Sequence, residues 1–363
     1  MFMKILLLSA YHAQSHQSWC RSLMVMFPEH EWILLTLPGR YFNWRIRGNA
    51  LSWSMGQRDI LEKNYDLVLA TSMVDCATLR GLIPNLANIP WVVYFHENQF
   101  EYPVSAKNDH TEPKMVSLYN ALCAEKVIFN SQYNYHTFIS GLERFLKKMP
   151  DQVPENILKS IASKSEVIPV PVNVDNFLPV DKGVESVPVL LWNHRWEYDK
   201  GPQQLYNVLT ELYQRKFLFK LNLIGPQFRV IPDAFDKIQQ EFSNVIINYG
   251  FIESVVEYKK ILASSDMVLS TALHDFQGLA ILEAVAAGCI PVVPSRLAYT
   301  EIFPEKYQYD SDLLLPMNEA KKMADLIIKL NENRNSTNLG DINISKFSIE
   351  GLQPTYSEIL YGI

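Results

Sequence analysis

Short apolar segments alternate with segments of helical periodicity along nearly the whole chain. Most of the apolar segments are unbroken by polar positions, which is typical of strands buried on both faces of a parallel sheet. The strands predicted in the first half are 4–9, 32–37, 67–70, 91–95, 127–130 and 166–170, with helices at 16–26, 75–82, 114–124 and 132–147. Those predicted in the second half are 189–192, 219–224, 245–249, 267–269 and 290–293, with helices at 202–215, 233–242, 254–264, 278–287, 318–330 and 348–361. This pattern predicts an α/β protein with doubly wound, Rossmann-like domains.

The alternation stops once, at residues 171–187, where prolines, a glycine and charged residues indicate a linker. We therefore predict an N-terminal domain at 1–178 and a C-terminal domain at 188–345. The last helix, in 346–363, is expected to pack back on the N-terminal domain. A chain of 363 residues suits two cores, because single cores stop growing near roughly 250 residues. Two such domains are expected to face a central cleft, with ligands at the carboxyl ends of the strands.

Composition narrows the class of protein. The chain is 48% hydrophobic and 20% charged, and no apolar run approaches the ~20 residues of a membrane span. The first ten residues are predicted as a strand rather than a signal peptide, because their apolar run is only about half a dozen residues long. The four cysteines are scattered without a C-x-x-C pair, which favours a reduced, cytoplasmic protein without structural zinc.

The net charge of −6 is unevenly distributed. Residues 181–363 carry 17 Lys and Arg against 23 Asp and Glu, whereas residues 1–180 balance at 16 against 16. Within residues 1–60, six basic residues stand against three acidic ones. A polyanionic partner is therefore expected to meet the N-terminal half.

The most informative segment is 266–293, which reads as a strand, a polar loop, a helix and a second strand. Gly278 stands where the loop becomes the helix, so backbone N–H groups there can approach an anionic ligand. Asp275 and Glu283 are predicted to flank the same ligand. In the alternative interpretation, Asp275 only caps the helix and Glu283 is a solvated helix residue.

Two cations follow the strand at 189–192. Arg195 and Lys200 precede a helix whose first turn contains Pro202. An arginine fork, a mobile lysine and a helix N-terminus together form a site suited to a diphosphate. Alternatively, the cations form surface ion pairs with Glu197 or Asp199.

Polar residues also follow two strands of the first half. The strand at 91–95 ends in His96, Glu97, Asn98 and Gln99, a position that normally faces a ligand crevice. His96 could orient or protonate a hydroxyl while Glu97 holds its ring, although a lone histidine is more often structural. After the first strand, His12 and His16 have a spacing that suits a metal pair, but no third ligand is apparent, which favours acceptor binding or capping.

The segment 39–53 interleaves cations with aromatic residues between two predicted strands. Arg40, Trp44, Arg45 and Arg47 are the candidates for RNA contacts, because aromatic faces stack on bases and arginines hold phosphates. The alternative is a loop that packs its own aromatic residues onto the domain.

Taken together, these motifs resemble those of retaining family 4 glycosyltransferases of the GT-B fold. The resemblance is carried by Asp275-x7-Glu283 with Gly278, by Arg195 with Lys200, and by His96 at a strand end. Further motifs resemble the tRNA-queuosine α-mannosyltransferase branch of that family. They are Tyr94-Phe-His-Glu-Asn-Gln99, Tyr102-Pro-Val, Phe129-Asn-Ser, Trp192-Asn-His-Arg-Trp-Glu197 and Ser270-Thr-Ala-Leu-His274.

The resemblance implies a division of roles. Arg195 and Lys200 would bind the donor diphosphate, Glu283 the nucleotide ribose, and Asp275 with the Gly278 loop the transferred sugar. The full predicted sets are His96, Glu97 and Asp275 as catalytic residues; Asn193, Arg195, Lys200, Gly225, His274, Gly278, Leu279 and Glu283 for the donor; and His12, His16, Arg40, Trp44, Arg45, Arg47, Asn98 and Gln99 for the acceptor RNA. The chain departs from the family in having Asp275 where Glu is usual, and Ala13-Gln14 where a Gly-Gly pair is common.

The activity that this resemblance implies is transfer of mannose from GDP-mannose, with retention, onto the queuosine base at the wobble position of a tRNA. No metal is expected to be required. One alternative is a family 4 glycosyltransferase acting on a lipid-linked or free glycan, which the pI of about 5.8 favours. Another is an inactive module that binds a nucleotide sugar or RNA.

Overall fold

The computed structural model describes residues 2–101, 111–172, 187–228, 230–334 and 339–363. Its chain divides into two compact units, one of residues 1–171 with 349–363 and the other of residues 172–348. The predicted linker and the Tyr102-Pro-Val motif lie largely outside the described residues.

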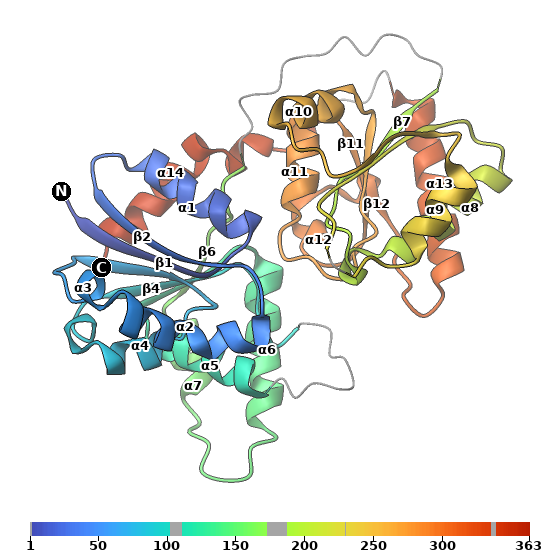
Figure 1. The fold of residues 1–363 in the computed structure, drawn as a ribbon. Coiled ribbons are helices and arrows are strands. Elements are labelled where there is room, and N and C mark those ends of the chain that lie inside the picture. The colour runs from blue at the N-terminus through green and yellow to red at the C-terminus, as the bar shows by residue number, and fades with distance from the viewer. Residues whose placement is uncertain (1, 102–110, 173–186, 229, 335–338) are drawn as a thin grey trace. The chain divides into compact units, whose positions relative to one another are not determined.

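The first unit is built on a six-stranded parallel sheet with the strand order β2-β1-β3-β4-β5-β6 (Figure 1). Its strands are β1 (Lys4–His12), β2 (Glu31–Pro38), β3 (Leu67–Thr71), β4 (Trp91–Phe95), β5 (Lys126–Phe129) and β6 (Ser165–Val167). Its helices are α1 (Gln14–Met26), α2 (Phe42–Gly56), α3 (Arg58–Leu61), α4 (Cys76–Leu82), α5 (Thr111–Cys123), α6 (Gln132–Leu146), α7 (Ile157–Ala162) and α14 (Ile349–Tyr361). The order reverses between β1 and β3, and ligands of doubly wound sheets bind at the carboxyl ends of strands at such a point.

The second unit repeats this architecture with the strand order β12-β11-β10-β7-β8-β9, again all parallel. Its strands are β7 (Val189–Trp192), β8 (Lys220–Ile224), β9 (Ile246–Gly250), β10 (Met267–Leu269), β11 (Ile290–Pro294) and β12 (Gln308–Tyr309). Its helices are α8 (Pro202–Gln214), α9 (Ala234–Phe242), α10 (Val255–Ser264), α11 (Leu279–Ala286), α12 (Tyr299–Ile302) and α13 (Pro316–Glu332). Here the order reverses between β7 and β10. The prediction of parallel sheets between helices is confirmed for both halves.

The last helix, α14, contributes to the first unit although it lies at the end of the chain. The buried indole of Trp19 on α1 donates a hydrogen bond of 3.0 Å to the hydroxyl of Tyr356. That hydroxyl in turn donates to the carbonyl oxygen of Pro169 at 2.9 Å. The amide of Gln353 donates to the carbonyl oxygen of Met26 at 2.8 Å.

The segment predicted as an aromatic and basic loop at 39–53 is mostly helix α2. The helix is not apparent from the sequence, because arginines and tryptophans are interleaved and do not form the single apolar stripe of an amphipathic helix. Trp53 and Ile46 are fully buried, whereas Trp44 on the same helix is 56% exposed. The aromatic residues of this segment thus serve two surfaces.

Candidate active site

The loops after β7 and β10 lie side by side, because these two strands are neighbours in the second sheet. Leu190 pairs with Met267 and Leu191 with Val268, so the strands end at the same edge. Residues 193–200 and 270–278 therefore meet where the strand order reverses, although they are distant in sequence. The backbone N–H groups of Leu273 and His274 both donate to the carbonyl oxygen of Asp199, which fixes one loop to the other.

Lys200 is held in the middle of this junction. Its ammonium donates to the carbonyl oxygen of His274 at 2.8 Å and to the carboxylate of Asp275 at 3.2 Å. The carboxylate of Asp199 lies 3.5 Å from the same nitrogen. Only 8% of Lys200 is exposed, so its charge acts in surroundings where water screens little.

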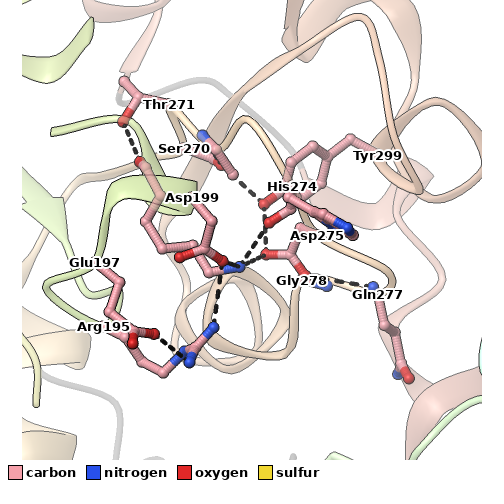
Figure 2. Close-up of polar contacts among 12 residues, drawn as sticks. Arg195, Glu197, Asp199, Ser270, Thr271, His274, Asp275, Gln277, Gly278 and Tyr299 are labelled. Carbon is pink, nitrogen blue, oxygen red and sulfur yellow. Dashed lines mark hydrogen bonds and ion pairs between the residues drawn. The ribbon is translucent and has the colours of Figure 1, made fainter. Parts of the chain in front are cut away.

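Arg195 is the more accessible cation of the pair. Its guanidinium forms ion pairs with Glu197 and, at 3.2 Å, with Asp199, as Figure 2 shows. Its side chain remains 42% exposed. The surface ion pairs of the alternative interpretation are thus present for Arg195, whereas the buried position of Lys200 is not that of a surface residue.

Asp275 is ionised and fully engaged. One carboxylate oxygen accepts from the backbone N–H of Gly278 at 2.9 Å, and the other accepts from the hydroxyl of Tyr299 at 3.1 Å (Figure 2). Burial alone would raise the pKa of Asp275, but Lys200 and the Gly278 N–H outweigh it and hold the pKa well below its usual range. Asp275 therefore orients Lys200 and also shapes the start of α11.

The backbone at Gly278 requires glycine. Its φ of +74° is the left-handed conformation, and a Cβ there would lie 2.6 Å from the ring of Tyr299. Gly278 is the N-cap of α11, and Leu279 is the first helical residue. The predicted turn from loop to helix at this residue is confirmed.

Glu283 belongs to a second network on α11. Its carboxylate accepts from the hydroxyl of Tyr258 at 2.9 Å, and the amide of Asn193 donates to that hydroxyl at 3.2 Å and to the carbonyl oxygen of Ala280 at 2.9 Å. Burial raises the pKa of Glu283 and raises that of Tyr258 strongly. Asp275 and Glu283 thus belong to two separate hydrogen-bond networks, one at the start of α11 and the other within this helix.

Gly225, at the end of β8, allows the β7 loop to pass closely. It has a φ of +150°, and a Cβ there would lie 1.8 Å from the carbonyl oxygen of His194. His194 and His274 are both buried. Burial, with Lys200 as the next cause, lowers the pKa of each histidine to about 4, so both are neutral at pH 7.

In the first unit, His96 lies in a cluster of aromatic rings. Its ring centroid is 4.1 Å from that of His16, 4.7 Å from Tyr94 and 5.3 Å from Trp19. Neither ring nitrogen of the buried His96 has a hydrogen-bond partner among the described residues, so the hydrogen bond expected from Glu97 is not formed. Burial holds the pKa of His96 well below its usual value and lowers that of His16 to about 4. A buried imidazole with two unbonded nitrogens is suited to receive a polar ligand.

Asn98 has a structural role, contrary to the prediction that it binds the acceptor. It is fully buried, and its amide nitrogen donates to the side chains of Asn134 at 2.9 Å and Thr137 at 3.0 Å. Its oxygen accepts from the backbone N–H groups of Phe100 and Glu101. Because its polar groups are satisfied within the protein, the amide fixes the turn after β4. Gln99 beside it is also buried.

The predicted RNA residues differ in accessibility. Arg45 is only 8% exposed, so burial within α2 removes it from the predicted RNA-facing set. Arg47 is half exposed and pairs with Asp75 at 2.6 Å and Glu112 at 3.4 Å. Arg40 and Trp44 are exposed. His12 is the last residue of β1, and its ring nitrogen lies 3.0 Å from the hydroxyl of Ser9.

The buried neutral histidines predict a strong dependence of stability on pH. For His16, His194 and His274 the folded pKa of about 4 lies below the unfolded value of 6.5, so the unfolded chain binds more protons between these values. The contribution of these histidines to the free energy of unfolding is therefore fully present above pH 6.5 and is lost as the pH falls toward 4. At pH 5 the expected loss is about 2 kcal/mol for each histidine.

Urea unfolding at pH 7.5 and 5.0 measures this difference. His194→Gln should reduce the pH dependence of the free energy of unfolding, whereas His136→Asn, which changes an exposed histidine, should leave it as in the wild type. Equal free energies of unfolding at the two pH values would contradict the assignment of neutral buried imidazoles.

Three further observations concern the described part of the chain. No grouping of three or more His, Cys, Asp or Glu side chains there could hold a metal ion. No helix among these residues is long and apolar enough to cross a membrane. None of the four cysteines forms a disulfide.

Two tyrosines of the site escape prediction from the sequence. Tyr258 on α10 holds Glu283, and Tyr299 on α12 holds Asp275. Both are aromatic residues on helices, a position that usually indicates core packing. Their hydroxyl groups become partners of the two carboxylates only in the folded structure, which brings together residues 24 and 25 positions apart in the sequence.

Family profiles and a curated relative indicate the same protein family for this chain. Residues 4–172 match the family profile described as tRNA-queuosine alpha-mannosyltransferase N-terminal, and residues 187–333 match Glycosyl transferases group 1. The tRNA-queuosine alpha-mannosyltransferase of Drosophila melanogaster is 32% identical over 368 residues, which cover 98% of this chain and 96% of the relative.

Solved structures support the fold. Anabaena Alr3699/HepE in complex with UDP and glucose matches with a TM-score of 0.72 at 16% identity, covering 99% of this chain and all of that one. The OtsA apo structure matches with a TM-score of 0.67 at 14% identity, covering 99% of each chain. These structures confirm the predicted GT-B fold class.

Proposed function

The chain belongs to the tRNA-queuosine alpha-mannosyltransferase family, and on this premise we propose that it transfers mannose from GDP-mannose onto the queuosine base at the wobble position of a tRNA. The observation that carries the proposal is 32% identity along almost the whole of a relative with that name. Transfer is proposed to retain the anomeric configuration and to take place in the cytoplasm. The absence of disulfides among the four cysteines accords with a reducing compartment.

In this proposal, Arg195 and Lys200 bind the donor diphosphate. Both cations already lie against carboxylates, Arg195 against Glu197 and Lys200 against Asp199 and Asp275. A bound diphosphate would take over part of these contacts at Arg195, which is the exposed cation. Lys200 is held in place by Asp275, so its charge is preorganised for the negative charge that develops on the leaving group.

The remaining donor contacts follow from α11 and its flanks. Glu283 is proposed to accept hydrogen bonds from the ribose hydroxyls, because Tyr258 orients its carboxylate. The start of α11 at Gly278 and Leu279 would offer N–H groups to the diphosphate or the sugar. Asp275 acts on the sugar through this loop and through Lys200, which makes it a positioning residue.

His96 is proposed to orient a substrate hydroxyl rather than to protonate it. Its lowered pKa keeps the imidazole neutral at pH 7, and a neutral ring offers one donor and one acceptor. In the transfer step the bond between the anomeric carbon and the diphosphate oxygen breaks, and the acceptor oxygen bonds to that carbon on the same face. The acceptor proton passes to the leaving phosphate, so no metal and no enzyme nucleophile are needed.

A transfer assay tests the proposed function. Purified protein is incubated with GDP-mannose, UDP-galactose or UDP-glucose and with tRNA that contains or lacks queuosine. The mass of the modified nucleoside is then measured by mass spectrometry. We expect one added hexose only with GDP-mannose and queuosine-containing tRNA, with the same yield when EDTA is present.

Arg195→Ala should lower the yield in this assay strongly. Transfer from a UDP-sugar, or onto tRNA without queuosine, would contradict the proposed substrates. Full activity of the Arg195→Ala variant would contradict the proposed diphosphate site.

A further inference from the structure

One face of α2 carries an exposed stripe of large apolar side chains. Tyr41, Trp44, Leu51 and Met55 are 71%, 56%, 52% and 76% exposed. The spacing of Trp44, Leu51 and Met55 places these three on one side of the helix together with Gly48, and Tyr41 is the N-cap residue directly before the helix. A contiguous patch of exposed large apolar side chains indicates an interaction surface.

Trp44 lies flat on the helix in this stripe. A Cβ at position 48 would lie 2.5 Å from Cε2 of Trp44 and 2.7 Å from Cζ2, so only glycine leaves room for the indole there. One face of the indole therefore rests on α2, while more than half of the side chain remains exposed. A large flat ring supported from behind is suited to stack on another ring.

Tyr41 is the second aromatic residue of the stripe and is backbone-strained. It has a φ of +58°, which non-glycine residues rarely adopt, and its ring is the most exposed aromatic ring of this segment. The guanidinium of Arg40 lies 5.5 Å from the centre of that ring. Residues in such backbone conformations cluster at active sites and ligand-binding sites.

The charge around the stripe favours a polyanion. No Asp or Glu occurs from Trp32 to Arg58, a stretch that contains four arginines. Three of them are engaged within the protein: Arg45 is buried, Arg47 pairs with Asp75 and Glu112, and Arg58 pairs with Glu62. Arg40 is exposed at the beginning of α2, next to Tyr41. Exposed aromatic faces beside arginines are the chemistry by which unpaired nucleic acid is held.

The stripe begins next to the crevice of the first sheet. A Cβ at Gly39 would lie 3.3 Å from the backbone nitrogen of Ala13 and 3.4 Å from the ring of Tyr11. The ring of Phe42, the first residue of α2, is 6.4 Å from that of Tyr11. The start of α2 thus adjoins Ala13, the residue that joins the end of β1, where His12 lies, to α1, which carries His16.

We propose that Tyr41 and Trp44 form a stacking platform for unpaired bases next to the acceptor nucleotide, with Arg40 holding the RNA backbone. This inference rests on the proposed function, because it takes the acceptor to be an RNA. The modified base occupies the crevice, and its neighbours in the loop lie on α2.

Binding of queuosine-containing tRNA, followed by fluorescence anisotropy, tests the platform. Trp44→Ala and Tyr41→Ala should each weaken binding by about 5- to 100-fold, the usual effect of losing one stacked base. Trp44→Phe should restore most of the affinity. Arg40→Ala should lower the slope of log affinity against log salt by about one unit. The matched control is Tyr213→Ala, which removes an exposed tyrosine of α8 and should leave binding unchanged.

Kinetics separate the platform from a structural role. In the two alanine variants the KM for tRNA should rise, while the KM for the nucleotide sugar and kcat at saturating tRNA stay as in the wild type. Wild-type tRNA affinity in the double variant would overturn the platform. So would an equal loss of affinity for a fully paired RNA duplex, or a change of oligomeric state in light scattering, since the stripe would then serve another contact.

The two proposals can fail separately. If wild-type protein transfers no mannose to queuosine-containing tRNA but Trp44→Ala still loses tRNA affinity, the proposed function fails and the platform stands. If transfer is observed and the variants bind like the wild type, the platform alone fails.

Discussion

Replacing Lys200 by methionine is expected to lower the rate of sugar transfer by about 10²- to 10³-fold. The ammonium of Lys200 is buried, and Asp275 and the carbonyl oxygen of His274 hold it in one position. A fixed positive charge in such surroundings stabilises a leaving diphosphate without first having to reorganise. Methionine retains most of the volume of lysine but provides no charge. Steady-state kinetics with the nucleotide sugar that the transfer assay identifies measure the loss.

The same replacement should also lower stability, because it leaves the carboxylate of Asp275 without its cation. The side chains of this pair are 10% and 15% exposed, and breaking a pair this buried costs about 3–5 kcal/mol. Asp275→Asn in the Lys200→Met background should recover much of the stability and little of the activity. Lys260→Met is the control, since Lys260 is 68% exposed and pairs weakly with Glu257. Transfer within tenfold of the wild type would refute the role given to Lys200.

Gly225→Ala is expected to destabilise the second unit by more than about 3 kcal/mol. The added Cβ would lie 1.8 Å from the carbonyl oxygen of His194, and backbone cannot yield as a flexible side chain can. The loop after β7 would have to move, and it carries Arg195 and Lys200. Stability and donor binding should therefore fall together, as urea unfolding and a nucleotide titration would report.

The control for this change is Gly81→Ala on α4. A Cβ at position 81 meets nothing within 4 Å, so alanine there should stabilise the helix by about 0.5–1 kcal/mol. Comparable stabilities of the two variants would show that the β7 loop tolerates displacement, against the close packing described above.

The strands and most helices could be predicted from the sequence because the apolar segments are short and uninterrupted. The ligand-binding role of the loops after β7 and β10 could also be predicted, since polar residues at the carboxyl ends of buried parallel strands normally face a ligand crevice. Helix α2 could not be predicted in this way. Its exposed face is as aromatic as its buried face, so apolar periodicity does not distinguish the two sides.

The roles of individual polar residues were harder to predict. Asn98 and His96 both follow β4, yet Asn98 is satisfied by the turn that it forms, while both nitrogens of His96 lack a partner among the described residues. Local sequence does not separate these outcomes, because the partners of the Asn98 amide nitrogen, Asn134 and Thr137, lie 36 and 39 residues away on α6. The pairing of Lys200 with Asp275 is likewise set by the adjacency of β7 and β10, across 75 residues.

The position of α14 in the first unit has a consequence for the order of events during synthesis. The first unit also contains residues 349–363, which the ribosome makes only after the whole of the second unit. Trp19 and Pro169 must wait for Tyr356 before their hydrogen bonds can form. The second unit, encoded without interruption from residue 172 to 348, can therefore complete its core before the first does, which reverses the usual N-to-C order of domain folding.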